Sequence, residues 1–318
     1  MATKKTRPPI LPANKRDPAG VDKLERGAMR EFGRRIRKIA RGYAKLLDRI
    51  PAEPVANRAE TKTRRYTFRL DQFLLESILA AGADLVDSIL LEGGQRNPWF
   101  FEAYVAVAYR RGTAQEFANL AQQSPAYLAG QISAADIMRS DPYRRRMALV
   151  QARTFEDMQG LAAGVRSAMA RILTDGIGRG LNPREIARNL NDQAGIEAGR
   201  ARRIARTEVP MALRRARWDE SDDATERYGL RTLEMHLSAL SPTTRATHAA
   251  RHGNLYTTEA VREWYSRDGN SINCKCSQTA VLVDEDGKPL VPAIQQRARE
   301  TKRVMKAKHN GPWADEDE

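Results

Sequence analysis

The sequence predicts a mainly α-helical N-terminal region, built from several amphipathic helices, followed by a small α+β C-terminal domain. Two observations predict this fold class. Apolar residues recur at steps of three and four along much of residues 21–220, as on one face of a helix. From Gly229 the period changes to two, because Leu233, Met235 and Leu237 alternate with polar residues as in a strand. We therefore expect a flexible basic arm over 1–20, a helical domain over 21–220, a small α+β domain over 221–290 and a polar tail over 291–318.

The composition excludes several classes of protein. The chain has 318 residues, of which 41% are hydrophobic and 30% charged, so a wholly disordered protein is excluded. The longest apolar stretch, Phe73 to Leu91, contains three acidic residues, and we therefore expect no membrane span. The first ten residues lack the apolar region of a secretory signal. We expect synthesis in a cytoplasm.

The first helix is expected between Val21 and Ile50. Its apolar face is formed by Phe32, Ile36, Ile39 and Tyr43 among others, at helical spacing. A basic stripe occupies the other side and consists of Arg30, Arg34, Arg37, Lys38, Arg41 and Lys45. Such a stripe could bind the phosphates of a nucleic acid or an acidic subunit. The alternative interpretation is an ordinary solvated surface, on which the aliphatic stems of the Lys and Arg side chains cover the helix.

Prolines and glycines separate the helices that follow. Pro51 and Pro54 end the first helix, and a second carries Leu74 to Ile89 before Gly93 and Gly94. Asn97-Pro98 and Asp141-Pro142 are start signals for helices that run toward Leu120 and Gly176.

A further helix start lies at Asn182-Pro183, with Glu185 placed for a capping box. We expect a short helix to Leu190 and a separate one over Glu197 to Glu220. Pro210 predicts a kink or break within the latter.

The small domain is expected to begin with the strand around Met235. Ser241-Pro242 is the predicted start of a short helix that carries Arg245 and His248, and Thr258 is the predicted cap of a helix through Trp264. Residues 278–283 are predicted to form a closing strand.

The positive charge is concentrated in two segments. The chain carries a formal net charge of +14, to which residues 1–60 contribute +9 and residues 200–217 contribute +6, so the remainder sums to −1. Concentrated basic segments indicate a polyanion or an acidic partner surface. The second segment adds these candidate nucleic-acid-binding residues to the stripe: Arg200, Arg202, Arg203, Arg206, Arg214, Arg215 and Arg217.

One constellation is more specific than composition. Ala205-Arg206-Thr207-Glu208 lies in a predicted helix, Thr244-Arg245-x-x-His248 and Gly253 follow, and Asn273-Cys274-Lys275-Cys276 closes the domain. This pattern resembles the phage head morphogenesis proteins of the Mu F and SPP1 minor capsid family. Lys275 replaces the family's usual arginine, and the family's aspartate ahead of the Thr-Arg pair is missing, with Ser238 or Ser241 near its place.

The resemblance implies a structural protein and not an enzyme. It implies a virion protein present in few copies in the phage head interior, made in the host cytoplasm, which acts in head assembly and in genome packaging or ejection. The implied partners are the portal protein, the major capsid or scaffold protein and double-stranded DNA without sequence specificity. We expect docking through exposed faces of the helices at Trp99 to Leu120 and Arg144 to Ile172, with Trp99 and Tyr109 as anchors.

The cysteines and histidines do not decide whether the protein binds a metal ion. No cofactor is required by the pattern, but His248, His252, Cys274 and Cys276 supply four nitrogen or sulfur ligands, which permit a structural zinc ion. Against zinc, Cys-x-Cys is not the usual ligand spacing, and packing of His248 against reduced thiols is the favoured alternative. Catalysis is disfavoured because no carboxylate is placed as an obvious base.

Two other function classes remain open. A metal-dependent nuclease would explain the basic charge together with the histidines and cysteines. A non-specific DNA-binding protein would explain the charge alone, and it would bind without any capsid partner.

Overall fold

The computed structural model describes residues 6–55, 65–130, 133–308 and 311–315. Contacts divide the chain into two compact units, the first made of residues 1–26, 103–150 and 206–318 and the second of residues 27–102 and 151–205. These units differ from the predicted consecutive domains because three long helices contribute residues to both: α1 (Asp22–Leu47), α6 (Asp141–Gly178) and α7 (Pro183–Tyr228). Among the described residues, no helix combines the length and apolarity needed to cross a bilayer.

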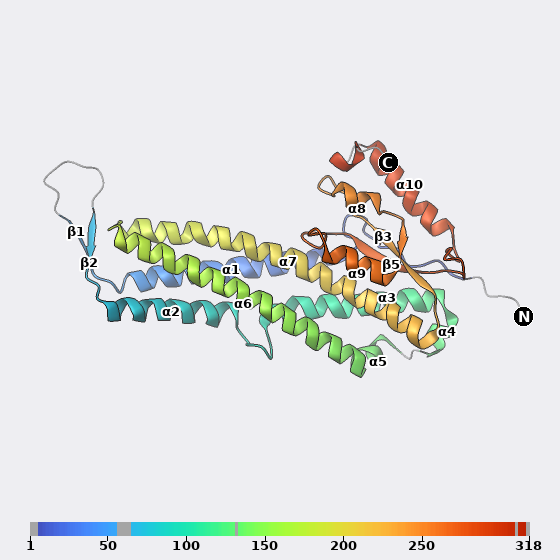
Figure 1. Cartoon of the computed structure of the whole chain (residues 1–318), viewed down its shortest axis with the longest axis horizontal. Helices are drawn as coiled ribbons and strands as arrows, with labels where there is room; N and C mark the ends of the chain where they lie inside the picture. The colour runs from blue at the N-terminus through green and yellow to red at the C-terminus, as the bar shows by residue number, and fades with distance from the viewer. Residues whose placement is uncertain (1–5, 56–64, 131–132, 309–310, 316–318) are drawn as a thin grey trace, which may run out of the picture. The chain divides into compact units, whose positions relative to one another are not determined.

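The second unit is a bundle formed by parts of α1, α6 and α7 together with α2 (Gln72–Leu90) (Figure 1). Buried apolar residues such as Phe32, Ile36, Val86 and Val165 form its core, as the helical period predicts. The helices α1 and α2 approach closely at Gly82, where an added Cβ would lie 2.7 Å from the ring of Tyr43.

A short hairpin that we did not predict follows α1 in this unit. Its strands β1 (Ala52–Pro54) and β2 (Tyr66–Phe68) pair antiparallel. The N–H of Tyr66 donates to the carbonyl of Gly180 at 2.9 Å.

The first unit combines helices with a small sheet. One turn of π-helix, η1 (Phe101–Val105), leads into α3 (Ala106–Gln123), and α4 (Pro125–Gly130) and α5 (Ala134–Arg139) follow. The antiparallel sheet has the order β4-β3-β5, with β3 (Thr232–Leu237), β4 (Leu255–Tyr256) and β5 (Ser277–Leu282).

Both faces of this sheet are covered. Met235, Leu237 and Val281 pack against Ile294 and Ala298 of α10 (Ala293–Ala307) on one face. On the other face, Ala280 packs with Leu120 of α3 and Ala224 of α7. Figure 1 shows β3 and β5 between α10 and α7. The alternating side chains of β3 and β5 therefore reach two different cores.

The fold class is confirmed, while several boundaries are corrected. The predicted break at Pro210 is wrong, because α7 runs continuously from Pro183 to Tyr228 and Pro210 is buried within it. The predicted polar tail contains α10 and the 3₁₀ turn η2 (Pro312–Ala314). The short helix α8 (Ala246–Ala250) begins after Arg245 and not at Ser241. The helix α9 (Thr258–Ser266) is present as predicted, but its cap is Thr257 and not Thr258.

The described part of the N-terminal arm, residues 6–20, makes hydrogen bonds where the sequence predicts flexibility. The N–H of Ile10 donates to Asn119 Oδ1 at 2.8 Å, and Gln122 donates to the carbonyl of Pro8 at 2.6 Å. Asp17 accepts hydrogen bonds from the N–H groups of Gly20, Val21 and Asp22 at the start of α1. Residues 1–5 of the arm lie outside the described residues.

Candidate functional site

The two cysteines lie on a loop between α9 and β5 that is held by its main chain. Arg214 of α7 donates to the carbonyls of Cys274 and Cys276 at 3.0 and 2.9 Å. Arg245 donates to the carbonyls of Gly269, Asn270 and Ile272 at 2.9–3.2 Å. The N–H of Asn273 donates to Thr207 Oγ1 at 3.3 Å. We call this segment, residues 267–276, the cysteine loop.

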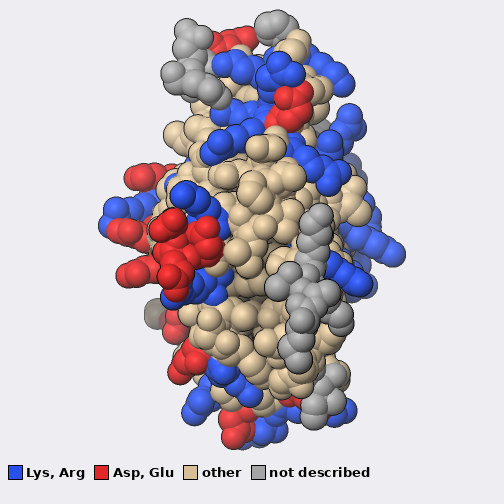
Figure 2. Space-filling model, turned by 90° about the vertical axis from the view of Figure 1, so that its right-hand side faces the viewer, with Lys and Arg blue, Asp and Glu red and all other residues tan. Residues whose placement is uncertain are grey.

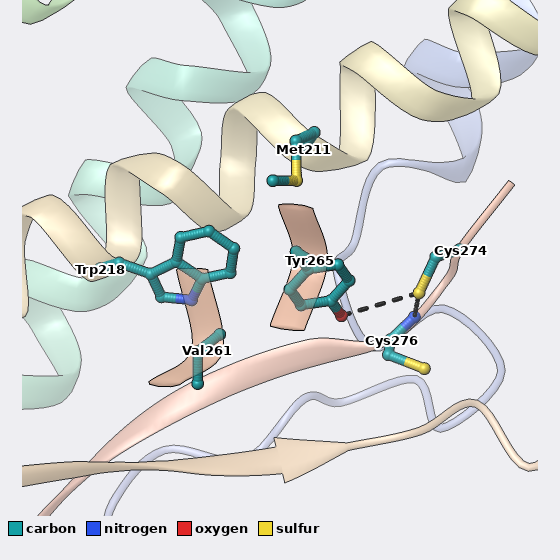
Figure 3. Close-up of a cluster of buried hydrophobic side chains, with 6 residues drawn as sticks. All are labelled: Met211, Trp218, Val261, Tyr265, Cys274 and Cys276. Atoms are coloured by element: carbon teal, nitrogen blue, oxygen red, sulfur yellow. Dashed lines mark hydrogen bonds between the residues drawn. The ribbon is translucent and has the colours of Figure 1, made fainter. Parts of the chain in front are cut away.

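The predicted meeting of His248 with both cysteines is present in the structure. His248 Nδ1 lies 3.4 Å from Cys274 Sγ and 3.4 Å from Cys276 Sγ. Cys274 Sγ also lies 3.6 Å from the hydroxyl of Tyr265 (Figure 3). All three residues of this Cys/His cluster, His248, Cys274 and Cys276, are buried, and both thiols are free.

A second histidine, His236, approaches the cluster from β3. One ligand atom each from His236, His248 and Cys276 lie within 4.8 Å of one another. His236 Nδ1 lies 3.1 Å from the amide nitrogen of Gln278, its partner across the β3–β5 ladder. No local sequence pattern points to His236, because its position near the cluster depends on strand register.

The two thiols have opposite pKa shifts. Burial alone would raise the pKa of Cys274, but the hydrogen bond with Cys276, the charge of Arg214 and the hydrogen bond with His248 together lower it well below its usual range. The hydrogen bond with Cys274, followed by burial, raises the pKa of Cys276 well above its usual range. The cluster therefore favours one thiolate and one thiol, with the thiol donating to the thiolate.

His252 does not join the cluster, which corrects the predicted ligand set. The helix α8 ends at Ala250, so the assumed i and i+4 placement of His248 and His252 on one helix face does not apply. His252 Nδ1 accepts a hydrogen bond from the N–H of Ser238 at 3.0 Å. Burial lowers the pKa of His252 to about 4.

Two of the cavities in the first unit are lined partly by His248 or His252. A polar cavity of about 50 Å³ is bordered by His248, Cys274 and Cys276, and by Ser241, Thr244 and Asn273 among others. A larger apolar cavity of about 340 Å³ lies between residues 11–18, the end of β3 and α10, with His252 in its wall.

The family-motif residues mostly hold the fold. Arg206 pairs with Glu25 at 3.3 Å, and Thr207 and Arg245 bind the cysteine loop as described above. Glu208, in the same turn of α7, is half-buried. Gly253 has a φ of +80°, a region that favours glycine, and its N–H donates to the carbonyl of His236. Asn273 also has a positive φ of 52°, which asparagine tolerates better than most residues.

Most candidate nucleic-acid-binding residues are exposed. The whole stripe on α1 is exposed, and its members are Arg30, Arg34, Arg37, Lys38, Arg41 and Lys45. Arg34 also pairs with Glu31. Arg200, Arg202 and Arg203 of α7 are exposed as well, while Arg206 and Arg215 are half-buried.

Arg214 and Arg217 are withdrawn from the predicted interface, because they are 0% and 4% exposed. Arg214 holds the cysteine loop. Arg217 Nε donates to the buried carboxylate of Glu116 at 2.6 Å, and its guanidinium also reaches Thr279 Oγ1 at 3.1 Å. These side chains satisfy internal acceptors and cannot meet an external polyanion.

Two groups of residues were missed by the sequence analysis. Glu116, Asn119 and Gln123 form a buried polar face on α3, and their spacing of three and four was a usable signal. The helix α10 is basic: Arg297, Arg299 and Arg303 are exposed and Lys302 and Lys306 are half-buried, against one acidic residue, Glu300. Figure 2 shows Lys and Arg gathered at the top of its view, the level at which α10 lies in Figure 1.

The docking anchors need one correction. Tyr109 is 1% exposed and its hydroxyl donates to Asp219, so it cannot anchor a partner. Trp99 is half-buried among Phe32, Phe100 and Arg35. Arg146, near the start of the second predicted docking helix, pairs with Asp223.

Comparison with known proteins agrees with the motif. Residues 168–279 match the family model described as Phage Mu protein F like protein. No curated protein and no solved structure matches the chain. The matched range contains the helix with Arg206, the segment with Arg245 and His248, and the cysteine loop. The predicted resemblance to the Mu F-like phage head morphogenesis proteins is confirmed over residues 168–279.

Proposed function

We propose that the protein is a minor head protein of a tailed bacteriophage, present in few copies, which contacts packaged DNA and docks on the portal or the inner capsid. The observation that carries the DNA part of this proposal is the exposure of the entire basic stripe on α1. Six cationic side chains along one helix face suit a row of phosphates without reading bases. We therefore expect binding that is independent of DNA sequence.

Three further exposed arginines on α7 and the basic side of α10 extend this surface chemistry. Arg200, Arg202 and Arg203 belong to the same unit as the stripe, whereas α10 belongs to the other unit. With about six phosphates neutralised, log affinity should fall against log salt with a slope near −5.

A docking partner is required by mass action. A protein with DNA affinity alone would remain on the host chromosome, where competing sites outnumber those on a phage genome. Phe73, at the start of α2, is 82% exposed, and aromatic side chains are common anchors in protein interfaces. We propose Phe73 as an anchor in place of Tyr109.

The DNA contact is tested by a matched pair of triple variants in the full-length protein. One replaces Arg37, Lys38 and Arg41 with Gln, and the control replaces Arg153, Arg179 and Arg188, exposed arginines of the same unit. The stripe variant should reduce the magnitude of the salt slope by about 3, and the control by much less. Equal slopes for both variants would refute the stripe as the contact.

The docking part is tested by co-expression with portal and capsid proteins. Heads assembled without DNA packaging should still contain this protein, and Phe73→Ser should reduce its copy number in them. If empty heads lack the protein while DNA-filled heads contain it, recruitment runs through DNA and the docking proposal fails.

A further inference from the structure

The Cys/His cluster has the dimensions of a zinc site. Zinc binds thiolate sulfur at about 2.3 Å and imidazole nitrogen at about 2.0–2.1 Å in tetrahedral geometry, which places neighbouring sulfur and nitrogen ligands about 3.5 Å apart. Both Sγ···Nδ1 distances at His248 are 3.4 Å. His248 Nδ1 thus lies at the distance from both sulfurs that binding to one shared zinc ion would require.

The cluster is held in this arrangement by other parts of the protein. Arg214, Arg245 and Thr207 bind the main chain of the cysteine loop and leave both thiols free to bind a metal. The ring of His248 packs edge-on against Trp264, with centroids 4.6 Å apart. Metal affinity rises when ligands are positioned in advance by such surrounding contacts.

The fourth position could be filled either by His236 or from the polar cavity, and hydrogen bonding favours the cavity. Trp218 Nε1 donates to Gln278 Oε1 at 3.2 Å, which fixes the amide so that its nitrogen faces His236 Nδ1. His236 Nδ1 must then accept, so its proton resides on Nε2. A protonated Nε2 cannot bind a metal.

The polar cavity borders all three ligands. Its volume of about 50 Å³ exceeds the roughly 10–15 Å³ that one water requires. Hydroxyl groups of Ser241 and Thr244 in its lining can hold such a water by hydrogen bonds.

We propose that His248, through Nδ1, and the sulfurs of Cys274 and Cys276 bind one zinc ion, whose fourth position is open to the polar cavity and is filled by water. This site is independent of the proposed DNA and capsid contacts. Its ligands come from α8 and from the cysteine loop that leads into β5, so the metal would tie α8 to the start of this strand.

The first test measures metal in the full-length protein. Protein purified under reducing conditions without chelator, then given zinc and passed through a desalting column, should retain about one zinc per chain by elemental analysis. Zinc should also protect both thiols of the unmodified chain from alkylation, and a chelator should remove that protection. Absence of both retention and protection would overturn the proposal.

The second test identifies the ligands with matched histidine variants. His248→Ala should lose the zinc, whereas His252→Gln and His236→Gln should retain it, with folding of each variant checked by circular dichroism. If His248→Ala does not fold, thiol protection in the other two variants decides the ligand set. Retention by His248→Ala, or loss by His236→Gln, would contradict the proposed ligands.

The third test examines the open position. Cobalt substituted for zinc should show the visible absorption of a tetrahedral thiolate site, and added azide should change that spectrum by displacing the water. A cobalt spectrum that azide leaves unchanged at saturating concentration would show a closed site.

Discussion

Two segments of α7 use arginine in opposite ways. Near the middle of the helix, Arg200, Arg202 and Arg203 are exposed, whereas Arg214 and Arg217, three turns further on, are buried and bind internal acceptors. Each of these arginines contributes the same single positive charge to the sequence. The difference teaches that a run of arginines can combine a surface for partners with the internal supports of a fold, and that charge counting alone does not separate them.

The strongest test of this contrast is Arg217→Met against Arg202→Met. Loss of the Arg217 guanidinium leaves the buried Glu116 carboxylate without its ion pair, which should cost roughly 3–5 kcal/mol of unfolding free energy. The exposed control should change stability by less than about 0.5 kcal/mol. Chemical denaturation of both full-length variants measures the difference, and similar losses would remove the distinction.

The second prediction concerns how the stability of the buried region around Glu234 depends on pH. Burial, followed by the nearby charge of Glu116, raises the pKa of Glu234 to about 8. The folded protein therefore holds a proton that the unfolded chain has released above its ordinary pKa of about 4.5, so this contribution to stability is complete below that pH and is lost as the pH rises toward 8. Glu234→Gln should remove that loss.

The check is the difference in unfolding free energy between Glu234→Gln and the unmodified protein from pH 5 to 9. The variant should gain relative stability with rising pH, since its amide can keep the contact with Ser221 that Glu234 makes at 2.7 Å. Glu259→Gln, an exposed change in the same unit, is the control. If this difference in unfolding free energy does not change with pH, Glu234 does not contribute to the pH dependence of stability.

Third, Arg214→Lys should cost about 1–3 kcal/mol, because an ammonium group lacks the fork that serves the two carbonyls of Cys274 and Cys276 at once. Thermal denaturation measures this loss. Arg203→Lys, at an exposed position of the same helix, is the control and should change little. An equal effect at both positions would argue against the loop contacts as the cause.

The smallest effect on stability is expected for the exposed arginines of α7. Replacing Arg202 and Arg203 with Gln should leave the melting temperature nearly unchanged, yet it should reduce the magnitude of the salt slope for DNA binding by about 2. Fluorescence anisotropy at several salt concentrations provides the measurement. If the salt slope stays the same, Arg202 and Arg203 do not contact DNA despite their exposure.

Much of the fold follows from local pattern. The apolar period of α1 and the alternation around Met235 identify a helix and a strand correctly. The continuity of α7 at Pro210 could not be predicted, because packing around this buried residue outweighs a local cost of about 3 kcal/mol. The helix α10 was missed because its strongly basic composition resembles a tail.

The candidate site shows the same limit. His248, Cys274 and Cys276 could be grouped from their motif, but His236 meets them through the pairing of β3 with β5, which no local spacing reveals. His252 was misplaced because α8 ends two residues before it. The burial of Arg214 and Arg217 had a weak signal, since Val209, Leu213 and Ala216 surround them with apolar residues.

The hydrogen bonds that hold the main chain of the cysteine loop have a consequence for how this protein can evolve. Arg214, Arg245 and Thr207 all bind main-chain atoms, which every amino acid provides. An outward-facing side chain such as the 44%-exposed Ile272 can therefore change without loosening the loop. Substitutions on the outer surface of this loop can create contacts with a new partner, while Arg214, Arg245 and Thr207 preserve the path of its main chain.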